Sequence, residues 1–108
     1  MNAIKTIALR ELAHARAGDK GDISNLSLIA YEQKDYELLR REVTPERVRQ
    51  HFAGVVRGGV TRYELPQLGA FNFVMQQALG GGVTRSLALD AHGKCLGAAL
   101  LAMRILVP

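Results

Sequence analysis

The sequence predicts an α+β domain in which two helices cover one face of a mostly antiparallel sheet. Segments in which apolar and polar residues alternate, as in strands, outnumber segments with helical periodicity. The helical segments lie between the strands along the chain, which favours helices packed on a sheet over separate layers. The length of 108 residues suits one hydrophobic core, so we expect a single domain over 1–108.

Two strands and a charged loop are expected in the N-terminal third. Alternation over residues 7–16 predicts a long strand, and its change of phase near Arg10 and Glu11 indicates a bulge. Residues 17–22 contain two glycines among charged residues and are typical of a loop. Residues 23–31 alternate again, so a strand is favoured there, although a helix capped by the preceding aspartate is the alternative.

The clearest helix is expected over Thr44 to Ala53. Thr44 suits the N-cap, Pro45 suits the first helical position, and Gly54 suits the stop. The apolar side of this helix consists of Val48, His51, Phe52 and Val55. This pattern predicts a helix that packs one side against the sheet.

The flanking segments are less uniform. Residues 35–41 fit either a helical stretch or an edge strand. Residues 60–65 alternate as a strand that ends at Pro66. Residues 70–79 place apolar side chains on one side of a helix, so we expect the second helix here, closed by glycines 80–82.

Two strands are expected to finish the chain. Residues 86–89 alternate, residues 90–94 predict a turn, and a long apolar stretch continues to Val107. As a strand, 98–107 would have two apolar faces and would need cover on both sides. Two helices cover only one face, so we expect the other sheet face to be buried against a second copy related by a twofold axis. The order of elements is ferredoxin-like with an extra N-terminal strand.

Composition excludes several classes of protein. With 48% hydrophobic and 22% charged residues, the chain is too apolar to stay disordered. Its longest apolar run, 95–103, is far shorter than a membrane helix. Cys95 is the only cysteine, so no disulfide can form within the chain, and we expect it to be a small core residue. A cytoplasmic protein with no membrane partner is expected.

The net charge of +4 does not predict nucleic-acid binding. The 14 basic and 10 acidic residues are spread along the chain, and tryptophan is absent. The densest basic segment is interleaved with Glu37, Glu42 and Glu46, and so favours a solvated helical face. Its arginines are Arg40, Arg41, Arg47, Arg49 and Arg57.

Several short strings carry a resemblance to a known family over nearly the whole chain. They are Arg16–Asn25, Arg62–Pro66, Asn72–Phe73, Leu79–Gly82, and Asp90 with Gly93–Lys94. Together they resemble the C-terminal domain of acyclic terpene utilisation protein A (AtuA-like) proteins. The resemblance implies a ferredoxin-like domain that generally follows a much larger N-terminal domain. It also implies catabolism of branched or isoprenoid acids, as coenzyme A thioesters.

The charged loop supplies the candidate catalytic residues Asp19, Lys20 and Asp22. Exposed amides beside Lys20 could hold a phosphate or carboxylate, carboxylates with the oxygens of Ser24 and Asn25 could hold Mg²⁺, or one carboxylate could act as a general base. A charged hairpin loop with a structural role is the alternative. The spacing fixes neither a metal site nor a cofactor. The predicted ligand-binding residues are Arg16, Gly18, Asp19, Lys20, Gly21, Asp22, Ser24, Asn25 and Asn72.

Other polar residues predict structural roles. The histidines at 14, 51 and 92 have no metal-ligand spacing, and His51 is expected to be a packed or interface residue. Arg62 and Glu64 share one strand face and are expected to form an ion pair.

Three hypotheses of function follow. In the first, the chain is a small accessory subunit that pairs with a larger AtuA-like chain and contributes its charged loop to a shared site. In the second, it is a self-sufficient acyl-CoA hydratase or lyase. In the third, it is a non-catalytic ligand-binding or structural homo-oligomer. The loop is expected to be exposed at one end of the sheet, near Asn25 and Asn72, lining a polar cleft.

Overall fold

A sheet with helices on one side forms the body of the computed structural model, which describes residues 5–20, 23–53, 58–76 and 95–107. The strands are β1 (Lys5–Ala8), β2 (Ala13–Lys20), β3 (Ile23–Ala30), β4 (Val60–Leu65), β5 (Ala70–Met75) and β6 (Arg104–Val107). The α-helices are α1 (Tyr36–Glu42), α2 (Pro45–His51) and α3 (Cys95–Leu101), and the 3₁₀ turns are η1 (Leu9–Glu11), η2 (Gln33–Asp35) and η3 (Pro66–Leu68).

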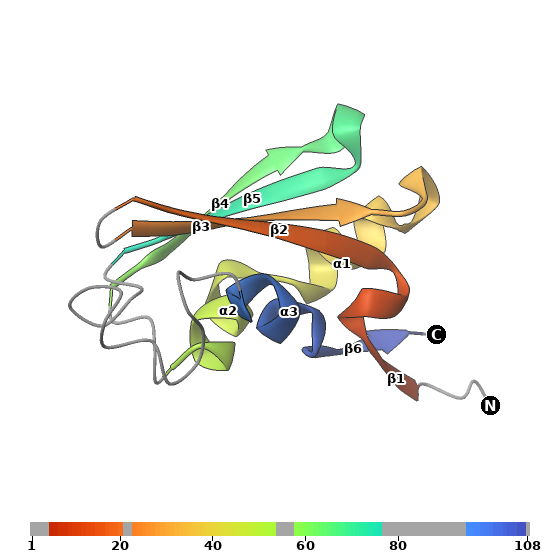
Figure 1. The fold of residues 1–108 in the computed structure, drawn as a ribbon. Coiled ribbons are helices and arrows are strands. Elements are labelled where there is room, and N and C mark those ends of the chain that lie inside the picture. The colour runs from red at the N-terminus through yellow and green to blue at the C-terminus, as the bar shows by residue number, and fades with distance from the viewer. Residues whose placement is uncertain (1–4, 21–22, 54–57, 77–94, 108) are drawn as a thin grey trace.

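The strands form two antiparallel sheets. The larger has the order β2-β3-β5-β4, and β1 pairs with β6 in a separate two-stranded sheet. The three α-helices of the described segments lie on the same side of the larger sheet (Figure 1). The α+β class and the antiparallel sheet are therefore confirmed.

The N-terminal strand is broken where a bulge was expected. The turn η1 separates β1 from β2, so the predicted single strand over 7–16 is wrong and its two parts belong to different sheets. Leu9 explains the break because it is fully buried and its N–H donates to the Met103 carbonyl at 2.8 Å. The extra N-terminal strand exists as β1, beside the C-terminal β6 (Figure 1).

The β2–β3 hairpin is longer than predicted. Its pairing continues to Lys20 opposite Ile23, so residues 17–20 belong to a strand and not to a loop. Residues 21–22 of the predicted loop lie outside the described residues. The strand predicted over 23–31 is confirmed as β3, whose inward side chains Leu26 and Leu28 are fully buried.

Helices α1 and α2 follow local rules. Residues 35–41, left open between helix and strand, form a helix that begins at Tyr36. The start of α2 is confirmed, since the Thr44 hydroxyl accepts the Arg47 N–H at 3.1 Å and Pro45 occupies the first turn. Val48 and Phe52 are buried as expected. The predicted stop at Gly54 and the apolar position Val55 lie outside the described residues.

The segment expected to be the second helix is the central strand β5. Phe71, Phe73 and Met75 are fully buried, whereas Asn72 and Val74 between them are half-buried, which is the period of a strand. Pairing with β3 on one side and β4 on the other outweighs the helical spacing of its apolar residues. The helix predicted over 70–79 is therefore wrong, and its closing glycines lie outside the described residues.

The C-terminal apolar stretch is a helix followed by a short strand. Its alanines and leucines favour α3, and a Cβ at Gly97 would come within 3.8 Å of Ala15, which shows how closely α3 packs on β2. The strand predicted from 95 to Val107 is wrong up to Leu101, so the two apolar faces inferred for 98–107 do not exist. The strand over 86–89 and the turn over 90–94 lie outside the described residues.

A close backbone approach at the start of β4 gives a stability prediction. A Cβ at Gly58 would lie 2.7 Å from the Gln76 Cβ and 2.8 Å from its carbonyl oxygen, so β4 would have to shift. We expect Gly58→Ala to lower the free energy of unfolding by about 1 to 2 kcal/mol in urea titrations. A Cβ at Gly59 would meet nothing within 4 Å. Gly59→Ala is the matched control, and an equal loss in both variants would contradict the prediction.

Candidate functional site

One face of the larger sheet points away from the helices and carries many of the predicted site residues. Because directly opposite residues in an antiparallel sheet share a face, the strand register defines its rows. One row is Arg16, Ser27, Asn72 and Tyr63, and the next is Gly18, Asn25, Val74 and Thr61. We call these eight residues the open face. No helix within the described ranges covers it (Figure 1).

An amide and a hydroxyl lie at the centre of the open face. The Asn72 side-chain amide donates to the Ser27 hydroxyl at 3.1 Å. Arg16 is exposed at one end of this row, and Tyr63 is 55% exposed at the other. At Gly18 a Cβ would lie 3.6 Å from the Asn25 side-chain oxygen, which is an ordinary van der Waals contact. The row therefore offers hydrogen-bond donors and acceptors to an incoming molecule.

The structure brings together part of the predicted ligand-binding set. Gly18 lies opposite Asn25, and Asn72 lies opposite Ser27, two residues further along β3. Ser24 lies on the other face, where it is fully buried and its hydroxyl donates to the Gly18 carbonyl at 3.2 Å. The set is thus divided between the two faces of the hairpin.

The candidate catalytic residues lie at the end of the β2–β3 hairpin. Asp19 is opposite Ser24 and Lys20 is opposite Ile23 in the strand register. Gly21 and Asp22 lie outside the described residues. The hairpin end belongs to the same sheet as the open face, so the backbone places residues 19–20 next to the row that contains Asn25.

Ser27 and Tyr63 were missing from the predicted site. Period-two alternation from Asn25 would have placed Ser27 on the same face. Tyr63 lies between Arg62 and Glu64 in one of the resemblance strings, so its side chain points to the opposite face from theirs. The strand period therefore predicts the face on which each of these side chains lies, but it does not predict which strands are neighbours in the sheet.

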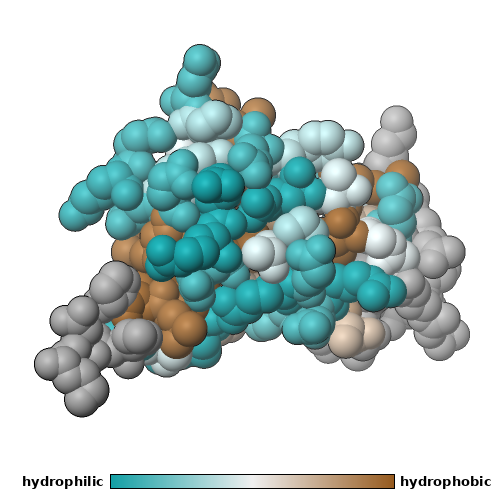
Figure 2. Space-filling view, turned by 180° about the vertical axis from the view of Figure 1, so that it is seen from behind, coloured by the Kyte–Doolittle hydropathy of each residue, from teal (hydrophilic) through white to brown (hydrophobic). Residues whose placement is uncertain are grey.

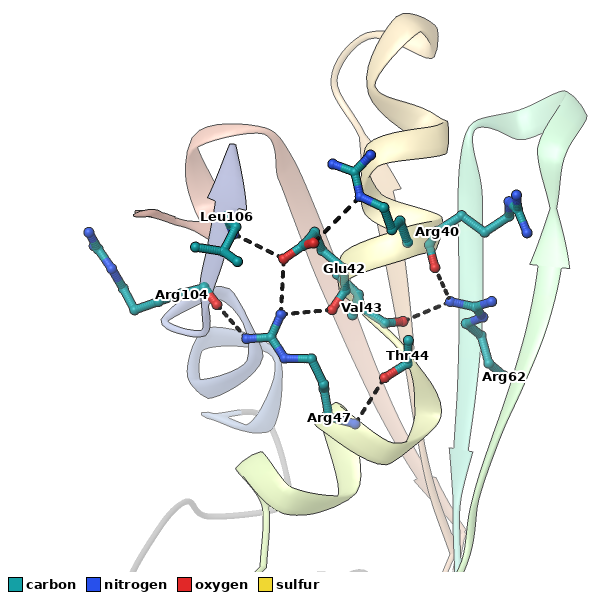
Figure 3. A network of polar contacts seen from close by, with 9 residues as sticks. Arg40, Glu42, Val43, Thr44, Arg47, Arg62, Arg104 and Leu106 are labelled. Atoms are coloured by element: carbon teal, nitrogen blue, oxygen red, sulfur yellow. Dashed lines mark hydrogen bonds and ion pairs between the residues drawn. The ribbon is translucent and has the colours of Figure 1, made fainter. Parts of the chain in front are cut away.

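Arg62 and Glu64 have a structural role on the inner face of β4. The predicted ion pair is confirmed, with Arg62 Nη2 2.9 Å from Glu64 Oε2. Arg62 Nη1 also donates to the carbonyls of Arg40 at 2.7 Å and Val43 at 2.9 Å (Figure 3). This residue therefore ties β4 to the C-terminal end of α1.

A second polar network links α1, α2 and β6. Glu42 Oε1 accepts from Arg47 Nη1 at 3.2 Å and from the Leu106 N–H at 3.0 Å, and Arg47 Nη2 donates to the Arg104 carbonyl at 2.7 Å (Figure 3). Arg40 pairs with Glu37 at 2.9 Å. Hydrophilic side chains cover much of the side of the molecule shown in Figure 2. Of the charges expected on a solvated helical face, Glu37, Arg40, Arg41, Glu46 and Arg49 are exposed, whereas Glu42 is largely buried and Arg57 lies outside the described residues.

Among the described residues, His51 and the hollow along α2 lie apart from the open face, whereas His14 precedes Arg16 by two residues on β2 and so lies on the same face of the sheet. His51 Nε2 is 2.6 Å from the Ala99 carbonyl, so it contacts α3 from an exposed position. His14 stacks on Tyr31 at 5.4 Å. A hollow of about 300 Å³ lies along α2. Over the described ranges, no group of three or more His, Cys, Asp or Glu is placed to hold a metal ion.

Tyr36 gives a prediction of pH dependence. It is buried, stacks on Phe71 at 4.7 Å, and its hydroxyl has no hydrogen-bond partner in the described part of the chain. Burial, and secondarily the charge of Glu64, raise the pKa of Tyr36 above its ordinary 10.0. The folded state therefore retains this proton when the unfolded state releases it, and the free energy of unfolding falls as pH rises above about 10.

We expect Tyr36→Phe to remove the part of the fall in the free energy of unfolding at alkaline pH that Tyr36 causes. It should also raise the free energy of unfolding at neutral pH by about 1 kcal/mol, because a buried unpaired hydroxyl is eliminated. Urea titrations across the pH range measure both effects. Tyr31→Phe, at a tyrosine that is 62% exposed, is the control. An identical alkaline decline in Tyr36→Phe and wild type would contradict the assignment.

The fold and the open face define a class: an α+β domain with a ferredoxin-like antiparallel sheet, helices on one side and a polar surface on the other. The model of the AtuA ferredoxin-like domain matches residues 7–106, and the chain belongs to that family. No curated protein and no solved structure matches the chain. None of the helices in the described segments is long and apolar enough to cross a membrane.

Proposed function

We propose that the chain is a small accessory subunit of an AtuA-like catabolic enzyme. The enzyme acts in the cytoplasm on branched or isoprenoid acids as acyl-CoA thioesters. The open face docks on a larger AtuA-like chain, and the β2–β3 hairpin contributes its charged end to a shared site. Asp19, Lys20 and Asp22 supply the charged groups there.

One observation carries this proposal: several residues of the strings that resemble the family lie on a sheet face that takes no part in the described hydrophobic core. Arg16, Gly18, Asn25 and Asn72 share the open face, while the core is filled from the other side of the sheet. Arginine and tyrosine are enriched at protein interfaces, and Arg16 and Tyr63 stand at the two ends of one row. Docking there explains why these polar residues lie together.

The hairpin suits a contribution to a site formed with another chain. Eight residue pairs, from Ala13 opposite Ala30 to Lys20 opposite Ile23, hold its backbone in a fixed register. Groups on such a paired element keep their geometry better than groups on a free loop. In the proposed site, Lys20 attracts a phosphate or carboxylate of the thioester, and one aspartate accepts a proton.

Co-expression with the larger AtuA-like chain of the same source tests the docking. The tagged chain should capture it in stoichiometric amount, and mass spectrometry should identify it. We expect Arg16→Glu and Asn72→Ala to reduce capture while the far-UV spectrum and melting temperature stay unchanged. Arg10→Glu makes the same charge change at an exposed position outside the open face. The proposal would be refuted if the captured material contained no AtuA-like chain, or if Arg10→Glu reduced capture as much as Arg16→Glu does.

The purified pair tests the shared site, with a branched-chain enoyl-CoA as the probe. Asp19→Ala and Lys20→Ala should abolish turnover while capture of the larger chain is retained. Their free energies of unfolding should stay within about 0.5 kcal/mol of wild type, because the proposal gives both side chains a role in the site and none in the core. Turnover of the probe by the small chain alone would instead favour the self-sufficient hydratase or lyase.

A further inference from the structure

Among the strands of the described segments, β4 forms one edge of the larger sheet, and some of its backbone groups point away from β5. The Gln76 N–H donates to the Gly59 carbonyl at 3.0 Å. The backbone groups of residue 59 therefore point toward β5. Hydrogen-bonded and outward positions alternate along an antiparallel ladder. Thr61 and Tyr63 therefore face β5 with their backbone groups, and Arg62 and Glu64 direct theirs away from the sheet. In the described segments, neither of these two residues makes a backbone hydrogen bond outside the sheet.

A second copy of the chain can use these groups if the two β4 strands pair about a twofold axis. Hydrogen bonding then requires outward positions of the two copies to lie opposite one another, and by the same alternation these are 60, 62 and 64. Registers with Arg62 opposite Arg62, or Glu64 opposite Glu64, oppose like charges, which is unfavourable. The register with Arg62 opposite Glu64 of the second copy opposes unlike charges twice. Registers with Val60 opposite Val60 or Arg62 oppose no unlike charges, so charge complementarity favours the register with Arg62 opposite Glu64.

The two side chains can take part without leaving their present contacts. Glu64 Oε2 accepts a hydrogen bond from Arg62 of its own chain, and Oε1 accepts none from the described residues. The Glu64 side chain is 41% exposed, so its carboxylate can be reached from the edge. In the selected register, arginine and glutamate alternate along the inner face of the joined strands. Each charge then has neighbours of the opposite sign.

We propose that two copies of the chain associate through β4, with Tyr63 opposite Tyr63 of the second copy. The two four-stranded sheets become one continuous sheet of eight strands, and the two open faces lie on the same side of it. The pairing makes four backbone hydrogen bonds at positions 62 and 64, since Pro66 has no N–H to extend it. Such a small interface places the association among weak, concentration-dependent dimers.

Disulfide trapping tests the register directly. Tyr63 of one copy lies opposite Tyr63 of the second copy in a pair that is not hydrogen-bonded. The Cα atoms of such a pair are about 4.5 Å apart, so a disulfide fits there. In a Cys95→Ser background, Tyr63→Cys should form a covalent dimer on mild oxidation. In Thr61→Cys or Leu65→Cys, the thiol of one copy lies about four residues along the strand, or about 13 Å, from the same thiol of the second copy. They should crosslink only when the two proteins are mixed, because position 61 lies opposite position 65.

Sedimentation of the unmodified chain from micromolar to submillimolar concentration provides an independent measurement. A monomer–dimer equilibrium is expected, and Glu64→Arg should weaken it about tenfold or more, because it opposes like charges twice. Glu37→Arg makes the same change on α1, at a side chain that is 73% exposed, and should leave the equilibrium unchanged. A strict monomer at every concentration, or self-crosslinking of Thr61→Cys as fast as that of Tyr63→Cys, would overturn the proposal. Neither result depends on capture of the larger AtuA-like chain.

Discussion

Glu42→Ala is expected to lower the free energy of unfolding by about 3 kcal/mol, because hydrogen bonds to a largely buried carboxylate contribute more than neutral ones. The Glu42 side chain is 12% exposed, and its Oε1 joins Arg47 of α2 to the backbone of β6 at Leu106 (Figure 3). Removing the carboxylate leaves the Leu106 N–H without its acceptor. It also leaves the Arg47 guanidinium without its charge partner.

Urea titrations and a double-mutant cycle with Arg47→Ala measure this effect. The cycle should show that much of the loss is shared between Glu42 and Arg47, since the two groups contact each other. Glu37→Ala is the matched control, because its carboxylate forms a surface pair with Arg40 and is 73% exposed. A loss for Glu42→Ala no larger than that for Glu37→Ala would show that the network does not stabilise the fold.

Elements defined by local chemistry could be predicted from the sequence. The helix α2 begins at a threonine followed by proline, and these two residues specify its start without reference to the rest of the chain. The strand β4 ends at Pro66, and β3 shows clean alternation. In each case the pattern and the tertiary environment favour the same structure.

Elements decided by tertiary packing could not be predicted from the sequence. The apolar residues of β5 fit both a helical and a strand period, and pairing with strands on both sides selects the strand. For α3 the opposite holds, because an unbroken apolar run gives no period. In the structure a helix packs there on the small side chains of β2, with Gly97 next to Ala15. Short apolar segments are ambiguous until their neighbours are known.

The candidate site was predictable to the same degree. The string from Arg16 to Asn25 identified the hairpin, but Ser24 lies on the buried face because alternate residues of a strand point in opposite directions. Ser27 and Tyr63 join the open face through the strand order β2-β3-β5-β4. That order depends on contacts between residues up to about half the chain apart, which a single sequence does not reveal.

Arg62→Met is expected to lower the free energy of unfolding by about 3 kcal/mol, since it removes charge-assisted hydrogen bonds to two helix-terminal carbonyls. The Arg62 side chain is 12% exposed, donates to the carbonyls of Arg40 and Val43, and lies 5.3 Å from the centre of the Phe71 ring. Methionine keeps the apolar contact with that ring but leaves the two carbonyls and Glu64 without their donor.

Arg62→Lys should recover only a small part of this loss. A lysine ammonium is a point charge, whereas the planar guanidinium reaches the α1 carbonyls with one nitrogen and Glu64 with another. Hydrogen exchange provides the local readout: the amides of α1 should exchange faster in Arg62→Met, because the end of the helix is no longer tied to β4. Arg40→Met, which removes a surface arginine paired with Glu37, is the control and should leave exchange in α1 close to wild type. If Arg62→Lys were as stable as wild type, a positive charge alone would be sufficient at this position, and the two-nitrogen contact would not be what joins β4 to α1.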